Sequence, residues 1–158
     1  MRRMFGLLLL GLLTSPALPA WAEGPSVDLP SAIRRAERVV VAAVVAVEPA
    51  WQTNKWGDRL IVSRTRVRAT EILKGGPASG DLAVDMAGGT LGGLTLKVSH
   101  APLVSPGDRA VFLLKRGENG VLVPTDHGAG VMKLTKDNRV TGSHLRLEDV
   151  RRAATAAR

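Results

Sequence analysis

Runs of valine separated by polar turns occupy most of the chain, a pattern that predicts strands rather than helices. Residues 39–47 are all apolar and dense in valine, and a Glu-Pro pair follows them. Such a run fits a strand buried on both faces that ends at the proline. Residues 50–58 then form a predicted polar loop that carries Trp51 and Trp56.

A second long strand is predicted over residues 59–73, where charged and uncharged side chains alternate. Arg64, Arg66 and Arg68, which we call the arginine row, point to one face of this strand. Because burying three unpaired arginines is prohibitive, the arginine row must face water or an anionic partner. The residues of the opposite face are Ile61, Thr65, Val67 and Ala69.

Shorter strands and two helices complete the predicted fold. A helix is expected at Ser31–Glu37 with Ser31 as its N-cap, and another after residue 144, where the apolar spacing becomes helical. The glycines of residues 88–93 indicate a sharp bend, since no Lys-Ser/Thr pair follows them as a phosphate loop requires. Further strands are predicted at 81–87, 94–99, 109–115, 121–123, 130–134 and 139–141. This pattern predicts an all-β fold with minor α: an OB-like β-barrel, closed or partly open, with a C-terminal helix.

The N-terminus has the three parts of a secretory signal: two arginines, an apolar run at 5–13 and the small-residue site Ala20-Trp21-Ala22. The apolar run is shorter than the roughly 20 residues of a spanning helix. We therefore expect export to the periplasm or the exterior, with no membrane span after cleavage. The predicted organisation is a signal peptide at 1–22, a β-barrel domain at 23–143 and a C-terminal helix at 144–158.

Composition narrows the classes of partner and chemistry. The chain has 22 Lys and Arg against 14 Asp and Glu, and its net charge of +8 either favours acidic partners or serves solubility alone. There is no cysteine, which excludes disulfides, thiolate metal sites and a cysteine nucleophile. Few aromatic residues are available as stacking platforms, which disfavours nucleic acid.

No catalytic or metal-binding motif emerges from the candidate side chains. His100, His127 and His144 do not have the spacing that places two ligands on one face of a strand or helix. Asp81 and Asp85 lie on one short strand and are interpreted as solvated charges. We therefore expect a protein without cofactor or metal that is not an enzyme. A hydrolase whose residues converge only in the folded chain is the alternative in that class.

Several segments carry a resemblance to a known family: residues 36–45, the loop with the two tryptophans, Val67 with residues 71–75, and residues 88–93, 106–113 and 130–134. Together they resemble a group of secreted bacterial proteins whose barrel is similar to the OB-type domain of tissue inhibitors of metalloproteinases and netrin modules. Animal inhibitors chelate the protease zinc through an N-terminal cysteine, which this chain lacks. The resemblance therefore implies a fold, and the inhibitory mechanism does not carry over.

The predicted function is a non-enzymatic binding module of the cell envelope or exterior, engaging a protein or an anionic polymer. Trp51 and Trp56 either fold back as a lid or stay exposed as contact anchors. The predicted contacts are Trp51, Trp56, Arg64, Arg66 and Arg68. The alternative function is a regulator or inhibitor of an exported protease that docks through the same loop without zinc chelation.

Overall fold

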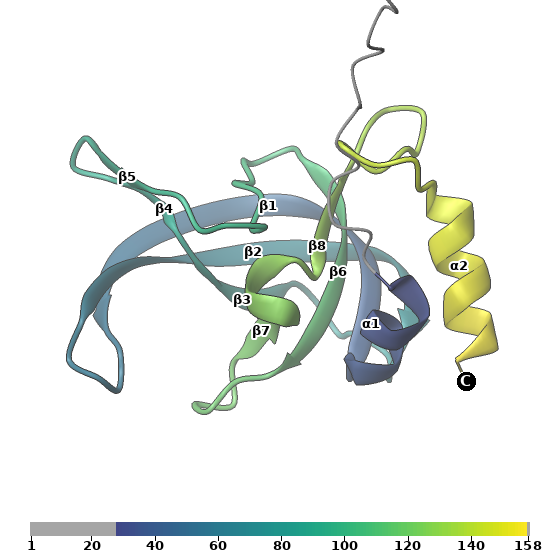
Figure 1. Cartoon of the computed structure of the whole chain (residues 1–158), viewed down its shortest axis with the longest axis horizontal. Coiled ribbons are helices and arrows are strands. Elements are labelled where there is room, and N and C mark those ends of the chain that lie inside the picture. Colours follow the sequence, from purple (N-terminus) through teal and green to yellow (C-terminus); the bar gives the residue numbers. More distant parts are fainter. Residues whose placement is uncertain (1–27, 158) are drawn as a thin grey trace, which may run out of the picture.

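The computed structural model describes residues 28–157, which form a mostly β chain with two short helices (Figure 1). The predicted signal peptide at 1–22 lies outside the described residues. In chain order the elements are α1 (Leu29–Arg35), β1 (Arg38–Thr53), β2 (Arg59–Lys74), β3 (Leu82–Ala87), β4 (Gly89–Leu91), β5 (Leu94–Leu96), β6 (Arg109–Arg116), β7 (Leu122–Pro124), the 3-10 turn η1 (Asp126–Gly128), β8 (Val131–Leu134) and α2 (Leu147–Ala156).

Six strands form one mixed sheet in the order β1-β2-β3-β7-β6-β8. Strand β1 also pairs with β6, so β1, β2, β3, β7 and β6 form a ring of five strands. The β3–β7 pair is parallel and the other pairs of the ring are antiparallel. Strands β4 and β5 form a separate hairpin. The prediction of a mostly β chain with a C-terminal helix is confirmed.

Strand β1 is buried on both faces at its start, as its unbroken apolar run predicts. Val39 and Val41 pack against the side covered by α1 and α2, together with Leu113 of β6. Val40 points into the interior of the ring, where it lies opposite Phe112. The core therefore has two parts, one under the helices and one inside the ring.

The predicted end of the first strand at Pro49 is wrong, because β1 continues to Thr53. Strand β6 pairs with β1 only as far as Ala43, and beyond Val44 the only strand among residues 28–157 that pairs with β1 is β2. Proline lacks an N–H group and is tolerated where one edge of a strand has no partner. We call residues 45–63 the arm; Figure 1 shows it projecting from the end of the sheet opposite the helices.

The predicted loop at 50–58 is accordingly shorter. Residues 54–58 form the turn between β1 and β2. Trp51 lies on β1, opposite Ile61, and Trp56 lies in the turn. The later predicted strands also differ at their ends: β5 stops at Leu96, and only isolated bridges form around Val140.

The first helix is present where predicted, but its N-cap is Asp28 and not Ser31. The Asp28 Oδ1 atom accepts a hydrogen bond from the Ser31 backbone N–H at 3.4 Å. Pro30 occupies the first turn, where its missing N–H costs nothing. Aspartate and serine are equally good N-cap residues. The position of Pro30 in the first turn therefore decides that Asp28, and not Ser31, precedes the helix.

Candidate binding surface

The two predicted tryptophans are exposed and do not form a lid over the core. Trp51 is 44% exposed and Trp56 is 75% exposed. The Arg59 guanidinium carbon lies 5.0 Å from the centre of the Trp51 ring, and Lys55 Nζ lies 4.9 Å from that of Trp56. Each ring therefore carries a neighbouring cation at cation–π distance.

Asn54 holds the turn at the end of the arm in one conformation. Its Oδ1 atom accepts hydrogen bonds from the backbone N–H groups of Trp56 and Asp58, each at 2.9 Å. An asparagine that bonds the backbone ahead of it stabilises a turn locally. Lys55 adds an ion pair to Glu118 at 2.9 Å, which ties the turn to the β6–β7 connection.

The arginine row lies on the exposed face of β2, as the alternation predicts. Arg64 donates two hydrogen bonds to Asp85, at 2.8 and 2.9 Å. Arg68 donates two to Asp81, at 2.9 and 3.3 Å. These hydrogen bonds raise the pKa of both guanidinium groups, and the bond from Arg68 lowers the pKa of Asp81.

The third member of the row is also matched by an acid. Arg66 Nε lies 3.9 Å from a carboxylate oxygen of Glu48 on β1. Because each guanidinium faces a carboxylate, the arginine row is not a free cationic stripe. The acids come from β1 and from β3 or the residue before it, so only the strand register reveals the pairing.

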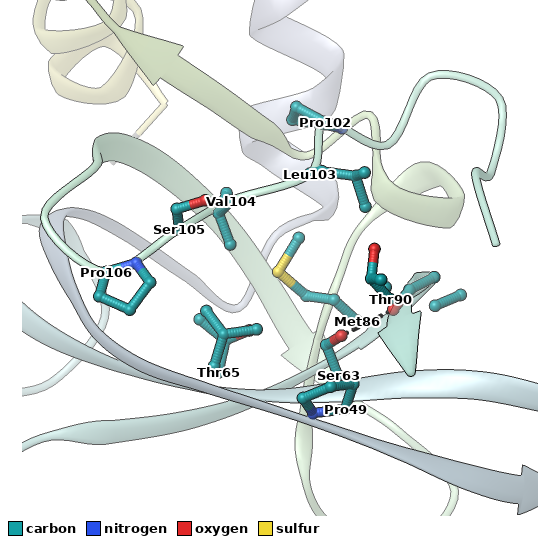
Figure 2. Close-up of a pocket in the computed structure, with 14 residues that line it drawn as sticks. Pro49, Ser63, Thr65, Met86, Thr90, Pro102, Leu103, Val104, Ser105 and Pro106 are labelled. Carbon is teal, nitrogen blue, oxygen red and sulfur yellow. Dashed lines mark hydrogen bonds between the residues drawn. The ribbon is translucent and has the colours of Figure 1, made fainter. Parts of the chain in front are cut away.

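A cleft of about 250 Å³, which we call the arm cleft, lies on the opposite face of the arm (Figure 2). The cross-strand pairs Val47–Thr65 and Pro49–Ser63 contribute to it. Trp51 comes two residues after Pro49 and therefore projects to the same face. The residues that line the cleft are Val47, Pro49, Ser63, Thr65, Met86, Ala87, Gly88, Gly89, Thr90, Pro102, Leu103, Val104, Ser105 and Pro106.

The lining of the arm cleft is uncharged and mostly apolar. Leu103 is 41% exposed, an unusual position for a large apolar side chain at the edge of a cleft. The Thr65 hydroxyl is buried and has no hydrogen-bond partner among the residues that the structure describes. A cleft of this kind suits an apolar group and offers no charged contact.

Ser63 and two glycines fix the shape of the cleft beside Thr65. Ser63 Oγ donates a hydrogen bond to the Gly88 carbonyl at 2.7 Å. A Cβ atom at Gly89 would lie 2.2 Å from that Oγ atom, so only glycine fits there. The predicted bend at 88–93 is thus confirmed, and it brings the backbone against β2.

The histidines do not assemble a metal site. Within residues 28–157 no group of three or more His, Asp or Glu side chains could hold a metal ion. His127 lines a second cavity, of about 420 Å³, which Asp85 and Glu118 also line. Arg64 and Lys55 hold these two acids in ion pairs.

No family model matches the chain, and no curated protein sequence matches it. Within residues 28–157, no helix is long and apolar enough to cross a membrane.

Sequence reasoning located the tryptophans but missed the cleft beside one of them. The wall formed by residues 102–106 has no strand or helix, and no periodic pattern of apolar residues marks it. The available signals were Ser63 and Thr65, two polar residues at inward positions of β2.

Proposed function

We propose that the chain is a non-enzymatic binding module of the cell envelope or exterior, and that it engages a protein through the cleft face of the arm. The observation that carries this proposal is the placement of exposed Trp51 on the same strand face as the uncharged arm cleft. A rigid aromatic anchor beside an apolar recess is the typical centre of a protein interface.

The charges of the arm and of the adjoining arginine row favour a protein over an anionic polymer. Binding of a polyanion depends on free cations, and the arginine row is matched by Asp81, Asp85 and Glu48. Arg59 stays beside Trp51, where the pair can contribute both stacking area and a donor. Tryptophan and arginine are the residues most enriched among interface hot spots.

The ring of five strands supports the proposal of an OB-like barrel. Its order β1-β2-β3-β7-β6 closes on β1, and its one parallel pair joins β3 to β7. A small ring of this kind, with a helix packed at one end, agrees with the resemblance to the OB-type domains named above. Export by the N-terminal signal remains part of the same proposal.

Affinity capture from an envelope extract tests the proposed function. Wild type and the Arg64→Glu/Arg66→Glu/Arg68→Glu variant should retain the same protein in raised salt, and Trp51→Ala should lose it. Leu94→Ala is the matched control, because Leu94 is a 60% exposed apolar residue outside the arm. Loss of capture with the arginine variant and with salt, but not with Trp51→Ala, would favour an anionic polymer.

The identity of the captured protein decides between the two non-enzymatic functions. A metalloprotease whose hydrolysis rate changes on titration with the chain would support the regulator of an exported protease. Trp56→Ala should then reduce the change in hydrolysis rate, because Trp56 is the more exposed of the two tryptophans of the arm.

A further inference from the structure

The second cavity, which we call the His127 cavity, is the larger of the two and has a different chemistry. Its volume is about 420 Å³. Many of the side chains that line it are aliphatic, and the others are charged or polar. The apolar residues that line it include Val62, Met86, Val98, Val121, Val123 and Pro124.

A strained turn forms one wall of the His127 cavity. Asp126, His127 and Gly128 follow one another with positive φ angles of 52°, 54° and 107°. Left-handed backbone is unfavourable for residues with a Cβ atom and normally occurs one residue at a time. Strain of this kind persists where the surroundings enforce it, and it concentrates at functional sites.

Contacts on both sides hold this turn in place. The Arg35 Nη2 atom donates a hydrogen bond to Asp126 Oδ2 at 2.8 Å. A Cβ atom at Gly128 would lie 2.4 Å from the Cβ of Ala101, so the turn packs directly against that segment. His127 is therefore presented to the cavity by a fixed backbone.

When the two acids that line the cavity are counted with their partners, Lys115 leaves one positive charge unpaired within residues 28–157. Asp85 is bound by Arg64 and Glu118 by Lys55. Lys115 and His127 line the same cavity, and neither has an ion-pair partner among residues 28–157. Lys115 lies opposite Val123 on β7, and both residues line the cavity.

We propose that the His127 cavity binds a small amphiphilic anion, with an apolar body and one carboxylate. An apolar cavity of about 150 Å³ accommodates the six carbon atoms of benzene, so 420 Å³ corresponds to about 17 non-hydrogen atoms. The aliphatic lining takes the body of this ligand. Lys115 pairs with the carboxylate, and His127 donates a hydrogen bond to it.

Calorimetric titration of the purified full chain with a matched pair of probes tests this site. Indole-3-propionate should bind about tenfold more tightly than indole-3-propionamide, which has the same shape without the charge. Lys115→Met should remove that difference and leave amide binding unchanged. Lys136→Met is the control, since Lys136 is an exposed lysine that does not line the cavity. Equal affinity for the two probes, or no binding of either, would overturn the proposal.

Two substitutions of His127 separate its binding role from its backbone conformation. His127→Gly relieves the strain and should raise the Tm while weakening propionate binding. His127→Asn tolerates the left-handed backbone, so it should weaken binding without a comparable rise in Tm. Unchanged propionate affinity in both variants would exclude His127 from the site. Trp51→Ala should leave propionate binding intact, because Trp51 does not line this cavity, so this test is independent of the cleft face of the arm.

Discussion

The two halves of β1 have different surroundings, although they belong to one continuous strand. Residues 38–43 pair with β2 on one edge and β6 on the other, and most of them are buried. Beyond Ala46, β2 is the only strand partner in the described part of the chain, and Trp51 is left exposed. A strand that extends past one of its partners changes from a core element to an exposed surface, while the remaining partner still supplies its backbone hydrogen bonds.

The largest predicted effect is a difference in the free energy of unfolding between a substitution beside the first half of β1 and one in its second half. Phe112→Ala empties the ring interior opposite Val40 and should lower the free energy of unfolding by about 3–5 kcal/mol. Trp51→Ala should lower it by less than about 1 kcal/mol, because that side chain is largely at the surface. Urea unfolding with an unchanged m-value measures both. Similar losses would mean that the arm contributes to the core.

A glycine substitution tests how closely the bend at 88–93 approaches the arm. Gly89→Ala should cost roughly 3 kcal/mol, from the clash with Ser63 Oγ and the positive φ of 140°. Gly57→Ala, at a positive φ in open space, should cost only about 1–2 kcal/mol. Adding Ser63→Ala should restore part of the Gly89→Ala loss in thermal unfolding. No recovery would show that backbone strain alone is responsible.

Substitution of threonine by valine should change the stability of the fold in opposite directions at two positions of β2. Thr65→Val removes a buried hydroxyl without a partner and should stabilise the fold by about 1 kcal/mol. Thr70→Val removes the hydrogen bond from Thr70 Oγ1 to the Val41 carbonyl at 3.1 Å, and should cost about 1 kcal/mol. Chemical denaturation gives both signs. Destabilisation by Thr65→Val would indicate that its hydroxyl is satisfied in solution.

The smallest predicted effect is a loss of stability at low pH that involves Asp108, close to the wall of the arm cleft. Burial acts to raise the pKa of Asp108, but the hydrogen bonds from Lys133 and the Ser105 backbone outweigh it and lower the pKa below 3.8. The carboxylate therefore contributes stability above pH 3.8 that is lost as the pH falls through the lowered pKa. The contribution is less than about 1 kcal/mol, since the pair is partly exposed. Asp108→Asn should flatten the stability profile in that range.

Sequence periodicity predicted which side of β2 carries each residue. The arginine row is exposed and Thr65 is buried, as alternation requires. It could not predict that Asp85 binds Arg64, because this contact depends on the register between β2 and β3. The same limit applies to the strand end at Pro49, since the tolerance for proline depends on where the pairing with β6 stops.

The arm cleft and the η1 turn were harder to predict. The cleft forms where residues 102–106 cross the arm, and a segment without periodic hydrophobicity has no pattern that places it. Asp126 and His127 tolerate left-handed backbone better than most residues, but their types do not require it. Packing of Gly128 against Ala101 imposes that conformation.

Pro49 also has a consequence for the way copies of the chain meet. An unpaired strand edge is a template onto which another strand can add, and such addition leads to aggregation. A second strand running along β1 beyond Ala46 would find no donor at Pro49, and the β-bulge between Val44 and Ala46 disturbs the spacing of the remaining groups. The arm can therefore remain long and exposed at high local concentration without self-association through its edge.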